Sequence, residues 1–169
     1  MPDRTPRALF TEGHKRKFLI VVDETPESDT ALYYAARRAK RTGGGLSLLF
    51  VIEPPEMPHW LGVADAFREE QYQKARAVFR LRARKLKAWG FEDIKYEEII
   101  REGSMTVEVM KLIEEDRDFG MLVLGASADP EGPGPLVSSL AAGAKAAMFP
   151  IPITIVPGNL TIEEIKGLA

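Results

Sequence analysis

Five short runs of hydrophobic residues recur along the chain, and most show no alternation with polar residues. They are Phe18 to Val22, Leu46 to Ile52, Ile94 to Ile100, Met121 to Leu124 and Pro152 to Val156. A continuous apolar run is typical of a strand buried on both faces of a parallel sheet. The third run begins half-exposed, and prolines surround the fifth. Because proline cannot donate to a central ladder, the fifth run is expected to be an edge strand.

Segments with helical spacing of apolar residues separate these runs. The first has Thr25 and Pro26 where an N-cap and a first helical residue belong, and glycines 43–45 end it. Further helices are expected at about 64–89, at 105–115, from Ser138 and Ser139 onward, and at 162–167. Thr161 and Glu164 match a capping box at the start of the last helix.

The long helix expected at about 64–89 carries many Arg and Lys residues between its apolar positions. The charged residues are expected to form a solvated face, and the apolar residues a seam toward the core. The apolar positions are Phe67, Ala75, Val78, Phe79, Leu81 and Leu86.

Strands that alternate with helices predict an α/β fold, a doubly wound five-stranded parallel sheet with helices on both faces in a three-layer αβα arrangement. Ligands of such sheets bind at the carboxyl ends of the strands, near the topological switch point. Asp23, Val51 and Gly125 fall at or near strand ends of this kind. The sequence therefore predicts one binding site at that edge of the sheet.

Composition limits the classes of function. A chain of 169 residues fits one domain, and a net charge of −2 gives no electrostatic footprint for nucleic acid. Without cysteine there is no thiol chemistry, and only His14 and His59 are available as histidine ligands or bases. No apolar run is long enough for a membrane span, so a cytoplasmic protein with a flexible leader over residues 1–16 is expected.

The segment from Met121 to Met148 combines a strand, a loop rich in glycine and proline, and a helix. That order favours anion binding, because unpaired N–H groups and the positive end of the helix dipole meet at one point. Gly125, Gly132 and Gly134 form neither a P-loop nor a dinucleotide fingerprint. The alternative is a flexible surface loop with a serine N-cap.

Four landmarks carry a resemblance to a known family: FLIVVDETPESDTAL, LSLLFVIEP, the Gly103 turn, and LVLGASADPEGPGPLVSS followed by PIPITIVPG. With them the chain resembles the universal stress proteins from about Lys17 to Gly158. The resemblance implies a domain over residues 17–158 with a short C-terminal helix or tail at 159–169. It also implies a flavodoxin-like, adenine nucleotide alpha hydrolase-like sheet with strand order 3-2-1-4-5.

Nucleotide-binding members of that family carry G-x-x-G, nine residues and then G-[ST] after strand four. The ungapped fit places Gly125, Ala128, Ser138 and Ser139 at these positions, so two of the four are kept. The resemblance implies that ATP or another adenine nucleotide is the ligand, and Mg²⁺ is a candidate to accompany it. Asp129 and Glu131 in the loop are acids that could hold that ion through bound water, and the alternative is that they are solvated loop residues.

Residues expected to bind nucleotide come from the ends of strands one, two and four and from the loop and helix that follow. They are Val22, Asp23, Val51, Leu124, Gly125, Ala128, Gly132, Gly134, Ser138, Ser139 and Leu140. By the resemblance, Asp23 accepts from a ribose hydroxyl or the adenine amine, and Val51 offers main-chain groups to the base. The alternatives are that Asp23 caps the following helix and that Val51, Leu124 and Leu140 pack in the core.

Two functions remain open at this stage. The first is a stress-response module that binds nucleotide, with at most slow ATPase activity because the loop holds no Lys or Arg. The second is a stress protein that binds no nucleotide and acts on protein partners through a dimer surface. The resemblance implies a homodimer formed through the edge strand from about Ile151 to Val156. His59 and Trp60 are candidates for a lid over the site.

Overall fold

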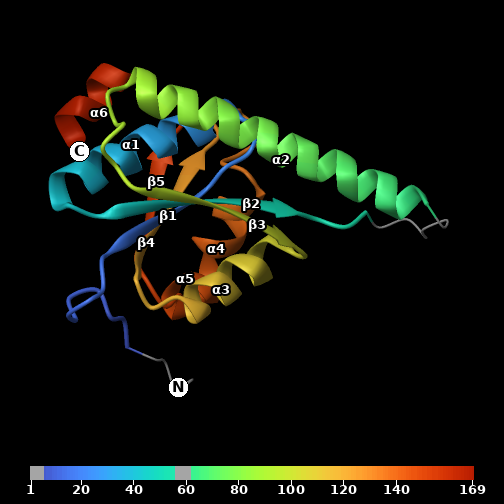
Figure 1. The fold of residues 1–169 in the computed structure, drawn as a ribbon, viewed down its shortest axis with the longest axis horizontal. Coiled ribbons are helices and arrows are strands. Elements are labelled where there is room, and N and C mark those ends of the chain that lie inside the picture. Colours follow the sequence, from blue (N-terminus) through green and yellow to red (C-terminus); the bar gives the residue numbers. More distant parts are fainter. Residues whose placement is uncertain (1–5, 56–61) are drawn as a thin grey trace.

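The computed structural model describes residues 6–55 and 62–169, in which a five-stranded parallel sheet lies between two layers of helices (Figure 1). The strand order is β3-β2-β1-β4-β5, and every neighbouring pair is parallel. The strands are β1 Lys17–Val21, β2 Gly45–Ile52, β3 Tyr96–Glu102, β4 Phe119–Ala126 and β5 Ile153–Pro157. The predicted fold class, strand order and edge position of β5 are therefore confirmed.

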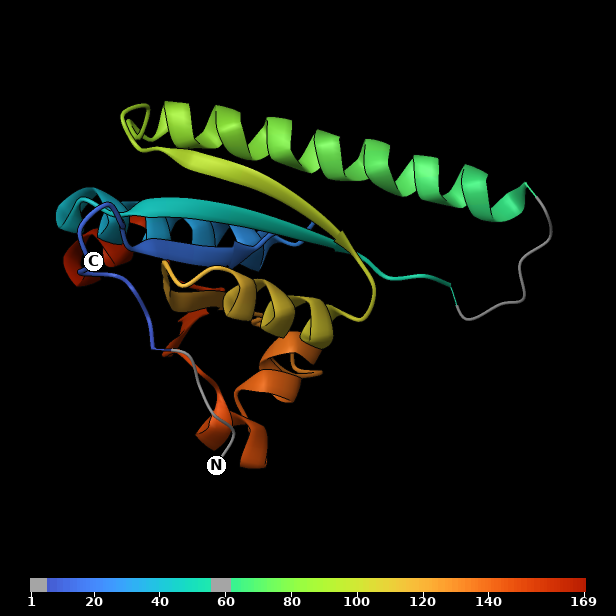
Figure 2. The same cartoon turned by 60° about the horizontal axis from the view of Figure 1, so that its bottom comes forward.

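Two hydrophobic cores lie on the two faces of the sheet. Helices α1, α2 and α6 cover one face, whereas α3, α4 and the segment after α5 cover the other (Figure 2). The helices are α1 Pro26–Thr42, α2 Val63–Ala88, α3 Met105–Glu115, α4 Pro135–Leu140, α5 Gly143–Met148 and α6 Ile162–Leu168. None of the described helices is long and apolar enough to cross a membrane.

The ends of α1 and α6 follow the signals in the sequence. Pro26 stands at the start of α1, and Gly43 ends it in the left-handed conformation at φ 69°. The predicted capping box of α6 is present, with the Thr161 side chain accepting from the Glu164 backbone N–H and the Glu164 carboxylate accepting in return. Arg37 of α1 donates to carbonyls of the α6 region at 3.2 and 3.3 Å, so α6 packs on α1.

The long helix α2 departs from the expected pattern at two positions. Leu81 was expected to face the core but is 46% exposed, whereas Arg82 was expected on the solvated face but is 2% exposed. The buried stripe of α2 runs through Ala75, Val78, Arg82 and Leu86 at spacings of three and four residues. Leu81 lies outside this stripe, because one residue turns a helix by about 100°. The amino-terminal half of α2 extends past the sheet (Figure 2).

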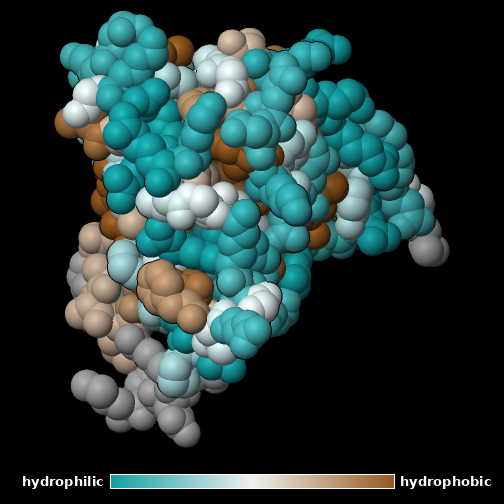
Figure 3. Space-filling view, turned by 60° about the vertical axis from the view of Figure 1, so that its left-hand side comes forward, coloured by the Kyte–Doolittle hydropathy of each residue, from teal (hydrophilic) through white to brown (hydrophobic). Residues whose placement is uncertain are grey.

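The segment expected as a flexible leader contacts the body of the protein where it is described. Ala8 is buried, and its N–H donates to the Arg117 carbonyl at 3.0 Å. Arg7 donates to the Ile113 carbonyl at 2.7 Å. These bonds place residues 7–8 against the end of α3 and the turn before β4. The face drawn in Figure 3 is mainly hydrophilic, with hydrophobic residues in small separate groups.

An ion-pair cluster lies at the amino-terminal edge of the sheet. Lys17 at the start of β1 donates to Glu97 at 2.9 Å and to Asp116. Burial raises the pKa of Asp116, but hydrogen bonds from Lys17 and from the Asp118 N–H outweigh burial and leave that pKa below its ordinary value of 3.8. A carboxylate with a lowered folded-state pKa stabilises the protein above the unfolded-state pKa, and this stabilisation is lost as pH falls through the folded-state pKa.

We therefore expect Asp116→Asn to be less stable than the parent protein at about pH 6, with the difference shrinking as pH falls below about 4. Urea unfolding at about pH 6 and pH 3 measures this difference. The exposed Asp93, whose carboxylate lies 3.8 Å from the Lys40 amine, gives the matched control Asp93→Asn. A difference for Asp116→Asn that is the same at both pH values would contradict the expectation.

Candidate functional site

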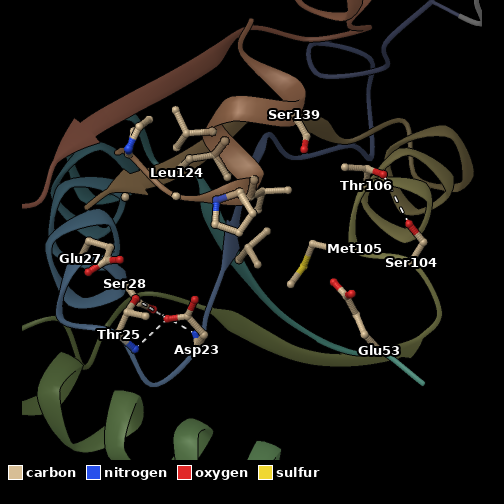
Figure 4. A pocket seen from close by; sticks show the side chains of 17 residues that line it. Asp23, Thr25, Glu27, Ser28, Glu53, Ser104, Met105, Thr106, Leu124 and Ser139 are labelled. Carbon is tan, nitrogen blue, oxygen red and sulfur yellow. Dashed lines mark hydrogen bonds between the residues drawn. The ribbon is translucent and has the colours of Figure 1, made fainter. Parts of the chain in front are cut away.

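A cavity of about 480 Å³ opens at the carboxyl ends of β1 and β4, where the strand order reverses direction (Figure 4). The connection after β1 runs to α1 on one face of the sheet, and α3 covers the opposite face. The cavity lies in the crevice between these connections, where doubly wound sheets bind their ligands. The lining residues are Val21, Asp23, Thr25, Glu27, Ser28, Glu53, Ser104, Met105, Thr106, Leu124, Gly125, Pro133, Gly134, Pro135, Leu136, Val137 and Ser139.

Five of the predicted site residues line this cavity, and six do not. Those in the lining are Asp23, Leu124, Gly125, Gly134 and Ser139. Those outside it are Val22, Val51, Ala128, Gly132, Ser138 and Leu140. His59, Trp60 and the lid predicted from them lie outside the described residues.

The residues outside the cavity have other surroundings. Val22 and Val51 are buried in opposite cores, and Leu140 is buried with Val51. Ala128 and Ser138 are exposed. For Val51 and Leu140 the structure therefore matches the packing alternative raised from the sequence. Leu124 is 2% exposed in the core and also lines the cavity.

The serines do not open the helix after β4, and that prediction is wrong. Helix α4 begins at Pro135, with Gly134 at the N-cap position at φ 102°, and it has only six residues. Ser138 lies in the body of the helix, where its N–H donates to the Gly134 carbonyl at 3.1 Å. Proline suits the first helical position because its missing N–H would have no partner there.

Hydrogen bonds within the loop between β4 and α4 occupy many of its backbone N–H groups. The Ser127 N–H donates to Pro133, and the Asp129 N–H donates to the Ser127 hydroxyl. The N–H groups of Glu131 and Gly132 both donate to Asp129, to its carboxylate and its carbonyl respectively. Across residues 6–55 and 62–169, no three His, Cys, Asp or Glu side chains are grouped to hold a metal ion.

Asp23 organises the turn between β1 and α1. Its Oδ1 accepts from the Thr25 N–H at 2.8 Å and from the Thr25 hydroxyl at 2.5 Å, while its own N–H donates to Ser28 (Figure 4). Asp23 therefore has the turn role considered above as the alternative to ligand binding. It does not cap α1, because Thr25 stands at the N-cap position and no side-chain cap hydrogen bond forms there. Asp23 nevertheless lines the cavity, so its carboxylate lies where a ligand would be.

Gly125 is required by packing. A Cβ at this position would lie 2.2 Å from the Glu27 carbonyl oxygen and 2.6 Å from its carbonyl carbon. The first turn of α1 therefore touches the end of β4 directly. Because Gly125 has no positive φ, close approach of the backbone is the reason for glycine here.

Several lining residues were missed by sequence reasoning. Glu53 follows β2, and Ser104, Met105 and Thr106 start α3. Their positions in the sequence could have indicated them, because Glu53 directly follows a predicted strand and residues 104–106 follow the Gly103 turn after the next one. The main chain of that turn joins β2, with the Gly103 N–H donating to the Ile52 carbonyl at 2.9 Å.

The lining is acidic. Asp23, Glu27 and Glu53 contribute three carboxylates, and no Lys, Arg or His is among the described residues that line the cavity. Figure 4 shows Asp23 and Glu53 in the lower part of the view, Glu27 at the left and Ser139 near the top. Behind the turn, the buried Arg82 donates to the Asp23 carbonyl at 2.5 Å and lies 2.7 Å from the Asp29 carboxylate.

Comparison with known proteins agrees with this geometry. A model of the universal stress protein family matches residues 15–157. The chain belongs to the universal stress protein family. A search of curated proteins gave no significant match.

Solved structures of universal stress proteins share the fold of this family member. UspA from Lactobacillus plantarum is 17% identical, with a TM-score of 0.62, over 85% of this chain and 98% of that one. A universal stress protein from Archaeoglobus fulgidus in complex with dAMP is 13% identical, with a TM-score of 0.59, over 83% and 97% of the two chains. A universal stress protein in complex with cAMP is 18% identical, with a TM-score of 0.56, over 83% and 96%.

Proposed function

We propose that this universal stress protein binds an adenine nucleotide or nucleoside in the cavity at the ends of β1 and β4. The observation that carries the proposal is the position of the cavity at the reversal of strand order, with half-buried polar groups around an apolar wall. Two solved relatives of the same fold hold dAMP and cAMP. Occupancy of the site would then regulate which protein partners the stress protein engages.

The lining offers suitable chemistry for such a ligand. Val21, Met105 and Leu124 give an apolar wall for a base, and the Ser139 and Thr106 hydroxyls both donate and accept hydrogen bonds. The free oxygen of the Asp23 carboxylate accepts from a ribose hydroxyl or an adenine amine. Within the described chain, only its Oδ1 has a hydrogen-bond partner.

Calorimetric titration of the nucleotide-stripped protein with cAMP and AMP tests the proposal. We expect binding, and we expect Ser139→Phe to abolish it because the ring would occupy space in the cavity that the ligand needs. Ser138→Phe is the matched control, since the neighbouring Ser138 is exposed and outside the lining. Absence of heat with every adenine compound up to about millimolar concentration would refute the proposal, because an affinity weaker than that leaves only about 4 kcal/mol of binding free energy.

The β5 edge supports a second proposal, a homodimer formed by pairing of this strand with its copy. β5 is at the end of the strand order, and Ile155 on it is 41% exposed. An unpaired strand edge is a template for pairing with another chain. Helix α6 follows β5 in the chain and packs on α1, and no further strand of the described residues pairs with the outer edge of β5.

We expect Ile155→Lys to convert a dimer to a monomer, measured by size-exclusion chromatography with light scattering. Charge on an edge strand opposes pairing. Ile162→Lys is the matched control, because Ile162 on α6 has the same exposed fraction of 41%. A protein that is monomeric before substitution would contradict the dimer.

A further inference from the structure

We infer that the cavity selects an adenine compound with little negative charge, such as adenosine or a cyclic monophosphate, over nucleoside di- and triphosphates. This inference rests on the proposed function and narrows its ligand class. Two independent features of the site carry it, the charge of the lining and the state of the groups that would have to hold a phosphate chain.

The first feature is the sign of the charges. Glu27 and Glu53 lie on elements that meet only in the folded protein, the first turn of α1 and the residue after β2, and both face the cavity with Asp23. No cationic side chain is among the described lining residues to offset them. Asp23 and Glu27 are half-buried, whereas Glu53 is exposed. Because like charges repel more strongly in a partly desolvated site than in water, each added phosphate charge lowers the affinity, mainly through Asp23 and Glu27. A neutral sugar or base instead donates hydrogen bonds to these carboxylates.

The second feature is a reduced set of phosphate donors after β4, where the N–H groups of Leu136 and Val137 in the first turn of α4 are those without an intrahelical partner. Pro133 and Pro135 have no N–H group, and both stand at the point where a phosphate loop would present its donors. The N–H groups of Ser127, Gly132 and Ser138 are already bonded to carbonyls of the loop itself. With only six residues, α4 also lacks the length of a strong dipole. Several N–H groups of the loop therefore bond to carbonyls of the loop itself, so they are not available to a phosphate chain.

The described carboxylates form no cluster of three or more that would hold a cation without help from the ligand. The carboxylate of Asp23 is partly used by Thr25, and that of Asp129 is bonded within the loop, outside the cavity. Mg²⁺ brought by ATP would still leave that ligand with net negative charge beside three carboxylates.

Calorimetric titration with adenosine, cAMP, AMP, ADP and ATP, the last two with and without Mg²⁺, tests the inference. We expect adenosine or cAMP to bind at least about tenfold more tightly than ATP, and the ratio to fall as salt is added. In the Glu27→Gln/Glu53→Gln double variant, we expect the ratio of the adenosine affinity to the ATP affinity to shrink severalfold. The control Glu131→Gln removes a loop acid outside the cavity and should leave the ratio unchanged.

The outcomes separate the inference from the proposal beneath it. If ATP binds as tightly as adenosine or cAMP, or if the double variant leaves the ratio unchanged, the inference is wrong while the proposed function stands. If no adenine compound binds, the proposed function fails, and the inference fails with it. If the ratio shrinks in the double variant but not in Glu131→Gln, the lining carboxylates cause the preference for a ligand with little negative charge.

Discussion

Replacing Arg82 with alanine is expected to destabilise the protein by about 3–5 kcal/mol, the usual cost of breaking a buried ion pair. The Arg82 side chain is 2% exposed on α2, lies 2.7 Å from Asp29 of α1 and donates to the Asp23 carbonyl at 2.5 Å. Without it, the Asp23 carbonyl loses this donor, and among the described residues the Asp29 carboxylate keeps its ion pair with Lys85. Chemical denaturation measures the loss, which would also lower the melting temperature by about 2–4 °C per kcal/mol.

Arg84→Ala is the matched control, because Arg84 lies on the same helix and is exposed. A surface change of this kind is expected to stay within about 0.5 kcal/mol. The double variant Arg82→Met/Asp29→Asn removes both charges, so we expect it to be more stable than the sum of the single variants predicts. A cost for Arg82→Ala no larger than that for Arg84→Ala would show that α2 does not depend on this pair.

The sequence predicted the sheet because each strand stands out locally. Runs such as Leu46 to Ile52 are apolar at nearly every position, as strands between two helical layers must be, and β2 is buried throughout. Proline around the last run marked the edge strand β5 correctly. The ends of α1 and α6 also carry local signals, the proline at the start of α1, Gly43 at its end, and the Thr161 capping box.

Arg82 shows what a local pattern leaves out. Its spacing from Val78 and Leu86 placed it on the buried stripe of α2, but its charge suggested solvent. Only the fold brings Asp29 of α1 and the end of β1 to that point, where their oxygens compensate the buried guanidinium. A partner 53 or more residues away cannot be found from the helix alone.

The candidate site was predicted in part for the same reason. In a parallel sheet the carboxyl ends of all strands lie at the same edge. Asp23 and Gly125 were therefore predicted as site residues from their positions at such ends, and both line the cavity. Glu27 and Glu53, which decide the charge of the cavity, are ordinary acids in their local sequence. The start of α4 was misplaced at the serines although Gly134-Pro135 is a strong start signal.

Substituting Gly125 with alanine is expected to destabilise the protein by about 1–3 kcal/mol, and valine by more, because either adds atoms to a packed contact. The new Cβ would lie 2.2 Å from the carbonyl oxygen of Glu27, so the first turn of α1 or the end of β4 must move. Gly45→Ala is the matched control. This glycine also lies in a strand, and its added Cβ would meet its nearest atom, the Lys95 carbonyl oxygen, at 3.4 Å.

Urea unfolding of the two glycine variants gives the comparison. A Gly125→Ala protein as stable as Gly45→Ala would show that α1 moves to make room for the added Cβ without loss of stability. The expected loss also bears on how the site is tested. The resemblance in sequence placed Gly125 at the first glycine of a nucleotide-binding motif, and in the structure its neighbour is the backbone of α1. If a Gly125 variant fails to bind an adenine compound, displacement of α1 is therefore enough to explain the loss, and the variant does not test the motif. Ser139→Phe with its Ser138→Phe control separates loss of the cavity from loss of the fold.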